Sequence, residues 1–117
     1  VLSFGALSDE SYDYPEASDQ VARAILASRA RFGVLVCGTG IGVSIRANRF
    51  EGIRAANCCS PEMAEMARKH NQANILCLGA RVLGEDGAIA ILKTFLETEP
   101  DMAERHVRRV EMLDRAL

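Results

Sequence analysis

The residues with the clearest chemical potential lie in the run VLVCGTGIG, at positions 34–42. It places a thiol directly before three glycines and a hydroxyl, namely Cys37, Gly38, Thr39, Gly40 and Gly42. Glycines let the backbone approach a ligand closely and turn its N–H groups toward that ligand. Such N–H groups can hold an oxyanion or a phosphate, and they favour the thiolate form of a neighbouring cysteine. The alternative is a tight turn from a strand into a helix with an inert, buried cysteine.

A second set of candidate residues stands in the second half of the chain. His70 and Asn71 come at the expected end of a helix, where a histidine transfers protons or merely complements the helix dipole. Arg105 and Arg109 are four positions apart, so on a helix both guanidinium groups project from one face. That face is either a phosphate clamp or an ordinary solvated surface.

Two further residues are candidates for contacts with a ligand. Tyr14 stands at the start of a predicted helix, where its hydroxyl would orient a sugar or would belong to the loop alone. Arg81 follows a predicted strand and a glycine, so it is expected near the same edge of the sheet. A thiol, an oxyanion cradle, a histidine and paired arginines together suit proton transfer on a small phosphorylated carbonyl compound.

Hydrophobic periodicity predicts the elements that position these residues. Short apolar runs predict strands, and spacings of three and four predict helices. The expected strands cover residues 1–4, 32–37, 53–57 and 74–78, and the expected helices cover 16–29, 43–48, 61–70, 85–97 and 100–116. Ser60 and Pro61 form a strong helix start, and Met102, Val110 and Leu113 are the expected apolar side of the last helix. This alternation predicts an α/β domain with a mainly parallel sheet.

Composition excludes several classes of protein. The 117 residues carry a net charge of −2, contain 5% aromatic residues and lack Trp, which argues against nucleic-acid binding. No apolar run is long enough to span a membrane and no segment resembles a secretory leader, so a cytoplasmic location is expected. The four cysteines match no zinc-ligand spacing, so reduced thiols and no bound metal are expected. The segment GTGIGVS does not match the dinucleotide fingerprint, which makes a nucleotide-binding module the weakest hypothesis.

Several motifs together resemble those of a known family. They are Asp13-Tyr14-Pro15, CGTGIG, GIRAA, ARKHNQAN, LGARVLG and RHVRRVE, and they span nearly the whole chain. In this order they resemble the ribose/galactose-6-phosphate isomerase family, most closely its ribose-5-phosphate isomerase B branch. The resemblance implies a three-layer αβα sandwich with a parallel sheet, Rossmann-like or flavodoxin-like. It also implies a homodimer or a dimer of dimers with active sites at the subunit interface.

The resemblance further implies a cofactor-free and metal-free interconversion of ribose 5-phosphate and ribulose 5-phosphate through a cis-enediolate. Cys37 would be the base, with Thr39 and the backbone of Gly38, Gly40 and Gly42 stabilising the enediolate oxygen. His70 would open the sugar ring, and Asn71 would bind sugar hydroxyls. The phosphate would be bound by Arg105 and Arg109, with Arg81 a further candidate, and Tyr14 would line the sugar pocket.

Three departures from the family pattern bear on these expectations. The family begins with a strand, an Asp-His-Ala-Gly motif and a long helix, so residues 1–117 are expected to be a single, N-terminally incomplete domain without that strand and helix. The helix at 100–116 is expected to pack on or reach the partner subunit. Residues 57–61, together with Arg46 and Arg49, differ from the usual pattern, which keeps two alternatives open. These are an isomerase of a six-carbon sugar phosphate (galactose 6-phosphate or allose 6-phosphate) and a non-catalytic partner subunit.

Overall fold

The apolar runs on either side of the glycine cluster form a parallel sheet at the centre of the protein. The computed structural model describes residues 1–6 and 12–117. Within that part of the chain the sheet consists of β1 (Gly33–Cys37), β2 (Ala55–Asn57) and β3 (Ile75–Gly79), in the order β1-β3-β2. Cys37 at the end of β1 lies opposite Gly79 at the end of β3. Side chains that follow these strands therefore meet at one edge of the sheet.

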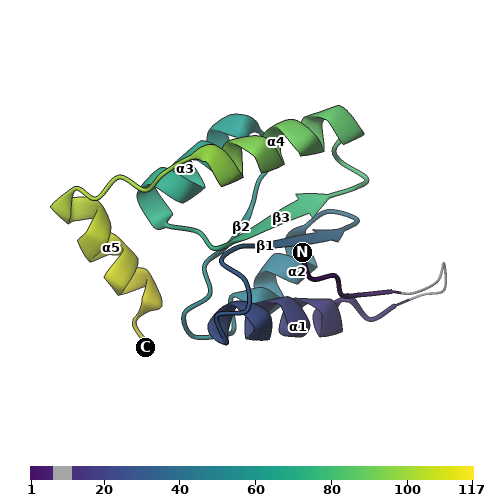
Figure 1. The fold of residues 1–117 in the computed structure, drawn as a ribbon, viewed down its shortest axis with the longest axis horizontal. Coiled ribbons are helices and arrows are strands. Elements are labelled where there is room, and N and C mark those ends of the chain that lie inside the picture. The colour runs from purple at the N-terminus through teal and green to yellow at the C-terminus, as the bar shows by residue number, and fades with distance from the viewer. Residues whose placement is uncertain (7–11) are drawn as a thin grey trace.

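Helices cover both faces of the sheet (Figure 1). One face packs against α1 (Tyr14–Leu26) and α2 (Ile41–Ala47), and the other against α3 (Pro61–Asn71) and α4 (Glu85–Glu97). Because side chains alternate along a strand, β3 contributes to both layers. Its Ile75 and Cys77 belong to the core under α1 and α2, whereas Leu76 and Leu78 belong to the core under α3 and α4. The expected three-layer α/β fold is confirmed.

Local signals place the helix starts. The Ser60 hydroxyl accepts a hydrogen bond from the Met63 N–H at 3.3 Å, so the predicted cap of α3 is present. Helix α1 begins at Tyr14, two residues before the expected start, and its Pro15 lies in the first turn, where proline fits without losing a hydrogen bond.

Two predicted elements differ in the structure. Residues 1–4 are not a strand, since they join no ladder with the described strands. The last helix, α5 (Glu104–Asp114), begins four residues after the expected start. Asp101 instead forms a turn, because its carboxylate accepts a hydrogen bond from the Ala103 N–H at 2.9 Å. Residues 7–11 lie outside the described part of the chain.

The inner side of α5 also differs from the prediction. Val110 is buried as expected, but Met102 and Leu113 are exposed. His106 is buried at 5% exposure and occupies the inner face of the helix beside Val110. A search for apolar side chains alone misses such a residue. Histidine is classed as polar, but its flat ring can pack in a buried position.

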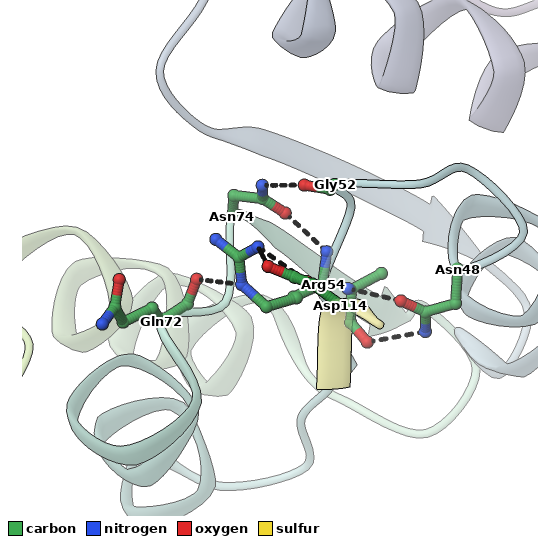
Figure 2. Close-up of polar contacts among 7 residues, drawn as sticks. Asn48, Gly52, Arg54, Gln72, Asn74 and Asp114 are labelled. Atoms are coloured by element: carbon green, nitrogen blue, oxygen red, sulfur yellow. Dashed lines mark hydrogen bonds and ion pairs between the residues drawn. The ribbon is translucent and has the colours of Figure 1, made fainter. Parts of the chain in front are cut away.

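Helix α5 lies apart from the layers, at the end of the sheet where the strands begin (Figure 1). At its C-terminal end the carboxylate of Asp114 accepts two hydrogen bonds from Nη1 of Arg54, at 3.0 and 2.9 Å (Figure 2). Nε of Arg54 also donates to the carbonyl of Gln72 at 3.0 Å. Arg54 directly precedes β2, so this contact fixes the end of α5 to the edge of the sheet.

The side chain of Asn74 joins the segments that lead into β2 and β3. Its amide nitrogen donates to the Gly52 carbonyl at 2.9 Å, and its amide oxygen accepts from the Arg54 N–H at 2.8 Å (Figure 2). On the other side of β2, the amide of Asn48 makes the same kind of double contact with the backbone of Ala55. Side-chain amides therefore supply the polar contacts at the start of β2, a strand of three residues.

In the described part of the chain, no helix is both long and apolar enough to span a membrane.

Candidate active site

The thiol of Cys37 lies in a loop of inward-facing N–H groups, which we call the thiol loop (residues 37–42). Cys37 is partly buried at the end of β1, and its Sγ accepts a hydrogen bond from the Gly40 N–H at 3.2 Å. Burial raises the pKa of Cys37, but hydrogen bonds from backbone N–H groups of residues 39, 40, 42 and 43 outweigh it. The pKa of this thiol is therefore lower than that of an ordinary cysteine.

The other thiols of the chain lie in different surroundings. Burial raises the pKa of Cys58 to about 11 and that of Cys77 to about 12. Cys59 is exposed. Cys37 is thus the cysteine whose thiolate the fold stabilises.

The path of the thiol loop depends on glycine. Gly40 has a φ of +80°, a left-handed conformation that side-chain-bearing residues rarely adopt. That turn brings the chain from β1 directly into α2, and it lets the Thr39 hydroxyl oxygen accept a hydrogen bond from the Ile41 N–H at 3.2 Å. The hydroxyl hydrogen of Thr39 is then free to donate to an oxyanion.

Two predicted ligand contacts, Tyr14 and Arg81, lie against the thiol loop. The ring of Tyr14 packs directly on Gly42, so closely that a Cβ at this position would overlap the phenol. The N–H of Arg81 donates to the carbonyl of Gly38 at 2.9 Å, and its side chain runs alongside the same glycine. The structure therefore places both residues beside the thiol loop.

Asn57, at the end of β2, also belongs to this region, and sequence reasoning did not select it. Its amide nitrogen donates to the carbonyl of Thr39 at 3.3 Å, so the end of β2 is hydrogen-bonded to the thiol loop. Its amide oxygen is buried beside Gly40 and has no hydrogen-bond partner among the described residues. The available signal was its position at the end of a strand in a parallel sheet, where ligand-binding residues gather.

The remaining candidate residues form a second group at the opposite end of the sheet, which we call the histidine edge. It consists of His70 and Asn71 in the last turn of α3 and of Arg105 and Arg109 on the exposed side of α5. In Figure 1, α5 lies at the end from which β1 and β3 point away. His70 stacks on His106, with ring centroids 4.3 Å apart and an angle of 8° between the planes.

The two groups are too far apart to serve one small ligand within a single chain. Strand β3 alone separates its first residue, Ile75, from Gly79 beside Cys37 by about 13 Å, at roughly 3.3 Å per residue. The C-terminal end of α3, which carries His70 and Asn71, leads into the start of β3, at the end of the sheet away from Cys37 (Figure 1). A sugar phosphate of five carbons measures at most about 9 Å from C1 to phosphorus, over six bonds of roughly 1.5 Å. The predicted site residues are therefore divided between two edges of the sheet.

The donor set does not favour a metal. In residues 1–6 and 12–117, no three His, Cys, Asp or Glu side chains cluster in a way that would hold an ion. The chemistry available at the thiol loop is that of a thiolate base beside N–H and hydroxyl donors. At the histidine edge it is that of imidazole and guanidinium groups.

Comparison with known proteins gives a consistent result. The sequence profile of a family described as Ribose/Galactose Isomerase matches residues 1–113. Ribose-5-phosphate isomerase B of Escherichia coli is 42% identical over 113 residues, which cover 97% of this chain and 75% of that protein. D-erythrulose-4-phosphate isomerase of Pectobacterium atrosepticum is 42% identical over 100 residues, with coverage of 80% and 66%.

Solved structures agree with the sequence relatives. A ribose 5-phosphate isomerase of Thermotoga maritima is 50% identical and superposes with a TM-score of 0.93. The match covers 96% of this chain and 77% of that one.

Proposed function

This chain belongs to the ribose/galactose isomerase family, and from that premise we propose that it interconverts ribose 5-phosphate and ribulose 5-phosphate. Its relatives make it a sugar-phosphate isomerase of the aldose–ketose type. One observation carries the proposal. A partly buried thiol accepts an N–H hydrogen bond at 3.2 Å in a loop that lowers its pKa, as a base for proton transfer near neutral pH requires.

The reaction begins with the cyclic aldose. His70 gives a proton to the ring oxygen O4 while solvent water takes the hydroxyl proton from O1, so the C1–O4 bond breaks and a C1 carbonyl forms. Asn71 is next to His70 at the end of α3, which is where a sugar hydroxyl would be bound during this step. The product is an open-chain aldehyde.

Proton transfer between carbons follows at the thiol loop. The Cys37 thiolate takes the proton from C2, and the charge moves to O1 of a cis-enediolate. The Thr39 hydroxyl and the N–H groups of the loop stabilise that oxygen. The thiol then returns a proton to C1 while the O2 proton passes to O1, which leaves a ketone at C2. No other atom is gained or lost.

We further propose that each active site combines two copies of the chain. The thiol loop of one copy would supply the base, and the histidine edge of the other would supply ring opening and phosphate binding. The distance between these two regions in one chain supports this arrangement, because a single pentose phosphate does not reach both. Arg105 and Arg109 are exposed and free to reach a second copy, as the expected position of the last helix at a subunit interface requires.

The test is an assay of aldose-to-ketose turnover with ribose 5-phosphate, galactose 6-phosphate and allose 6-phosphate in parallel. Cys37→Ser is the matched control, because it keeps the shape of the side chain and removes the thiolate. We expect turnover of ribose 5-phosphate that falls by about a thousandfold in the variant, since a positioned base contributes on that order.

The other outcomes separate the alternatives. Turnover of a six-carbon sugar alone would keep the mechanism and change the substrate. No turnover by a folded dimer would contradict the catalytic proposal, and it would favour a partner subunit without its own chemistry.

A further inference from the structure

The stacked imidazoles of His70 and His106 join two helices that are distant in sequence. His70 belongs to the last turn of α3 and His106 to the first turn of α5. Their planes are within 8° of parallel, and the centroids are 4.3 Å apart. The mechanism described above uses His70 and assigns nothing to His106. Yet His106 is the more buried of the two and is held in a fixed place.

The surroundings of His106 fix its position but leave one ring nitrogen without a hydrogen bond. Its Nε2 lies 3.5 Å from a carboxylate oxygen of Asp101, and it has no hydrogen-bond partner among the described residues. Asp101 is itself held in place, since its N–H donates to the carbonyl of Lys69 in α3 at 3.0 Å. A buried ring nitrogen without a partner costs stability, so a purely structural role would be met better by an apolar ring.

Burial and the charges around His106 favour its neutral ring. Burial lowers its pKa, the positive charges of Arg105 and Arg109 and any positive charge on His70 lower it further, and the Asp101 carboxylate opposes them. These groups come from α3, from the turn before α5 and from α5 itself. A neutral ring lets His70 accept and release a proton without a second cation against its face.

We propose that His106 is a positioning residue for sugar-ring opening, because its flat ring fixes the plane in which His70 presents its nitrogens to the substrate. The inference rests on the proposed function in one respect, the ring-opening role of His70. His106 itself is buried and does not touch the sugar. Its effect is therefore confined to the step that His70 catalyses, and the proton transfer at Cys37 is unaffected.

The substrates themselves separate these two steps. Ribose 5-phosphate is cyclic and must be opened before it reacts. Ribulose 5-phosphate has its C5 oxygen phosphorylated, so it cannot form a five-membered ring and is already open. In D₂O, exchange of the C1 hydrogen of ribulose 5-phosphate reports proton transfer at Cys37 and does not depend on ring opening.

The decisive experiment compares His106→Leu with His106→Phe. Both substitutions fill the buried site, but only phenylalanine keeps a flat ring against His70. We expect His106→Leu to lower the isomerisation rate of ribose 5-phosphate by about tenfold or more, as loss of orientation does. Its exchange rate with ribulose 5-phosphate should stay within about twofold of the parent chain, because the base is unchanged. His106→Phe should restore isomerisation to within about threefold of the parent.

Asp114→Asn is the matched control. It loosens the attachment of α5 without touching His106, because it weakens the contact with Arg54 at the other end of that helix. It should leave both rates nearly unchanged. Equal losses in His106→Leu and Asp114→Asn would overturn the proposal, and so would equal losses of isomerisation and exchange in His106→Leu. Either result would mean that His106 only docks the helix.

Proton NMR gives a readout that does not require activity. The chain has two histidines, so in each His106 variant the only remaining histidine ring signals are those of His70. The Cε1 proton of His70 should show a ring-current shift in the parent and in His106→Phe, and it should lose that shift in His106→Leu. If the parent neither isomerises nor exchanges, the proposed function fails. The proposal on His106 is then overturned if His70 gives the same shift in both variants.

Discussion

The thiol loop and the histidine edge are built in different ways, although both are expected to serve one reaction. The thiol loop is made mainly of backbone groups, and it follows directly from β1 beside the fully buried strand β3. The histidine edge depends on α5, which is joined to the domain by a ring stack, the Asp101 turn and the Arg54–Asp114 ion pair. The proposed proton-transferring atoms are thus placed by the core, and the proposed phosphate-binding atoms by a helix with few contacts.

This difference has a physical reason. A base that moves a proton between neighbouring carbons must be placed within a fraction of an ångström, which a buried sheet provides. A phosphate group is large and doubly charged, so long arginine side chains can bind it from a less rigid helix. A peripheral helix is also free to make contacts with a second copy of the chain.

The largest effect should come from mixing two inactive variants. Cys37→Ser damages the thiol loop and His70→Asn damages the histidine edge, and each alone should retain less than about 1% of the parent activity. If each site combines both regions from different copies, heterodimers contain one intact site. An equimolar mixture, unfolded and refolded together, should recover about a quarter of the parent activity. Recovery below the sum of the two single variants would contradict the composite site.

Removing one arginine should mainly weaken binding. Arg105→Ala or Arg109→Ala should raise KM by about tenfold to a hundredfold, since a charged hydrogen bond contributes about 1.5–3 kcal/mol. kcat should change little, because the thiol loop is untouched. Arg108→Ala is the matched control, since it removes the same charge from an exposed position on the same helix. An equal rise in KM with Arg108→Ala would show that only the overall charge matters.

The pH dependence should reflect the thiol loop. The folded protein lowers the pKa of Cys37, so its thiolate persists below the ordinary cysteine value of about 8.5 and is lost as the pH falls. kcat/KM should therefore rise with pH with a midpoint below about 8.5. Alkylation of Cys37 by iodoacetamide should follow the same curve, whereas buried Cys58 and Cys77 should remain unmodified in the native protein. A midpoint at or above the ordinary value would contradict the role of the backbone N–H groups.

The smallest effect should come from the Arg54–Asp114 contact. Both side chains are partly exposed, so Asp114→Asn should lower the free energy of unfolding by about 1 kcal/mol or less, as measured by urea denaturation. The alkylation rate of Cys37 should be unchanged, since the thiol loop does not depend on α5. A faster or slower alkylation would show that the two regions are coupled.

Much of the thiol loop was predictable, because its signals are local. The apolar strand before Cys37 and the glycines after it each act within a few residues. The position of Arg81, two residues after β3, then followed from the rule that parallel strands end at one edge of the sheet.

The histidine edge was less predictable, because its geometry depends on tertiary packing. The stack of His70 on His106 joins residues 36 positions apart, and no local pattern marks it. The late start of α5 at Glu104 reflects the Asp101 turn, which competes with the helix for the same backbone groups. For the same reason, the sequence did not reveal that Cys37 and His70 lie at opposite ends of one sheet.

The side chain of Asn74 has a consequence far from its own position. Strand β2 has three residues, so little in its own ladder prevents it from slipping by one residue along β3. A slip of one residue would turn Asn57 to the opposite face of the sheet and away from the Thr39 carbonyl. By binding the backbone on both sides of Ile53, the Asn74 amide locks the alignment of β2. An amide at one end of the sheet thus determines which side chain stands beside the thiol loop at the other.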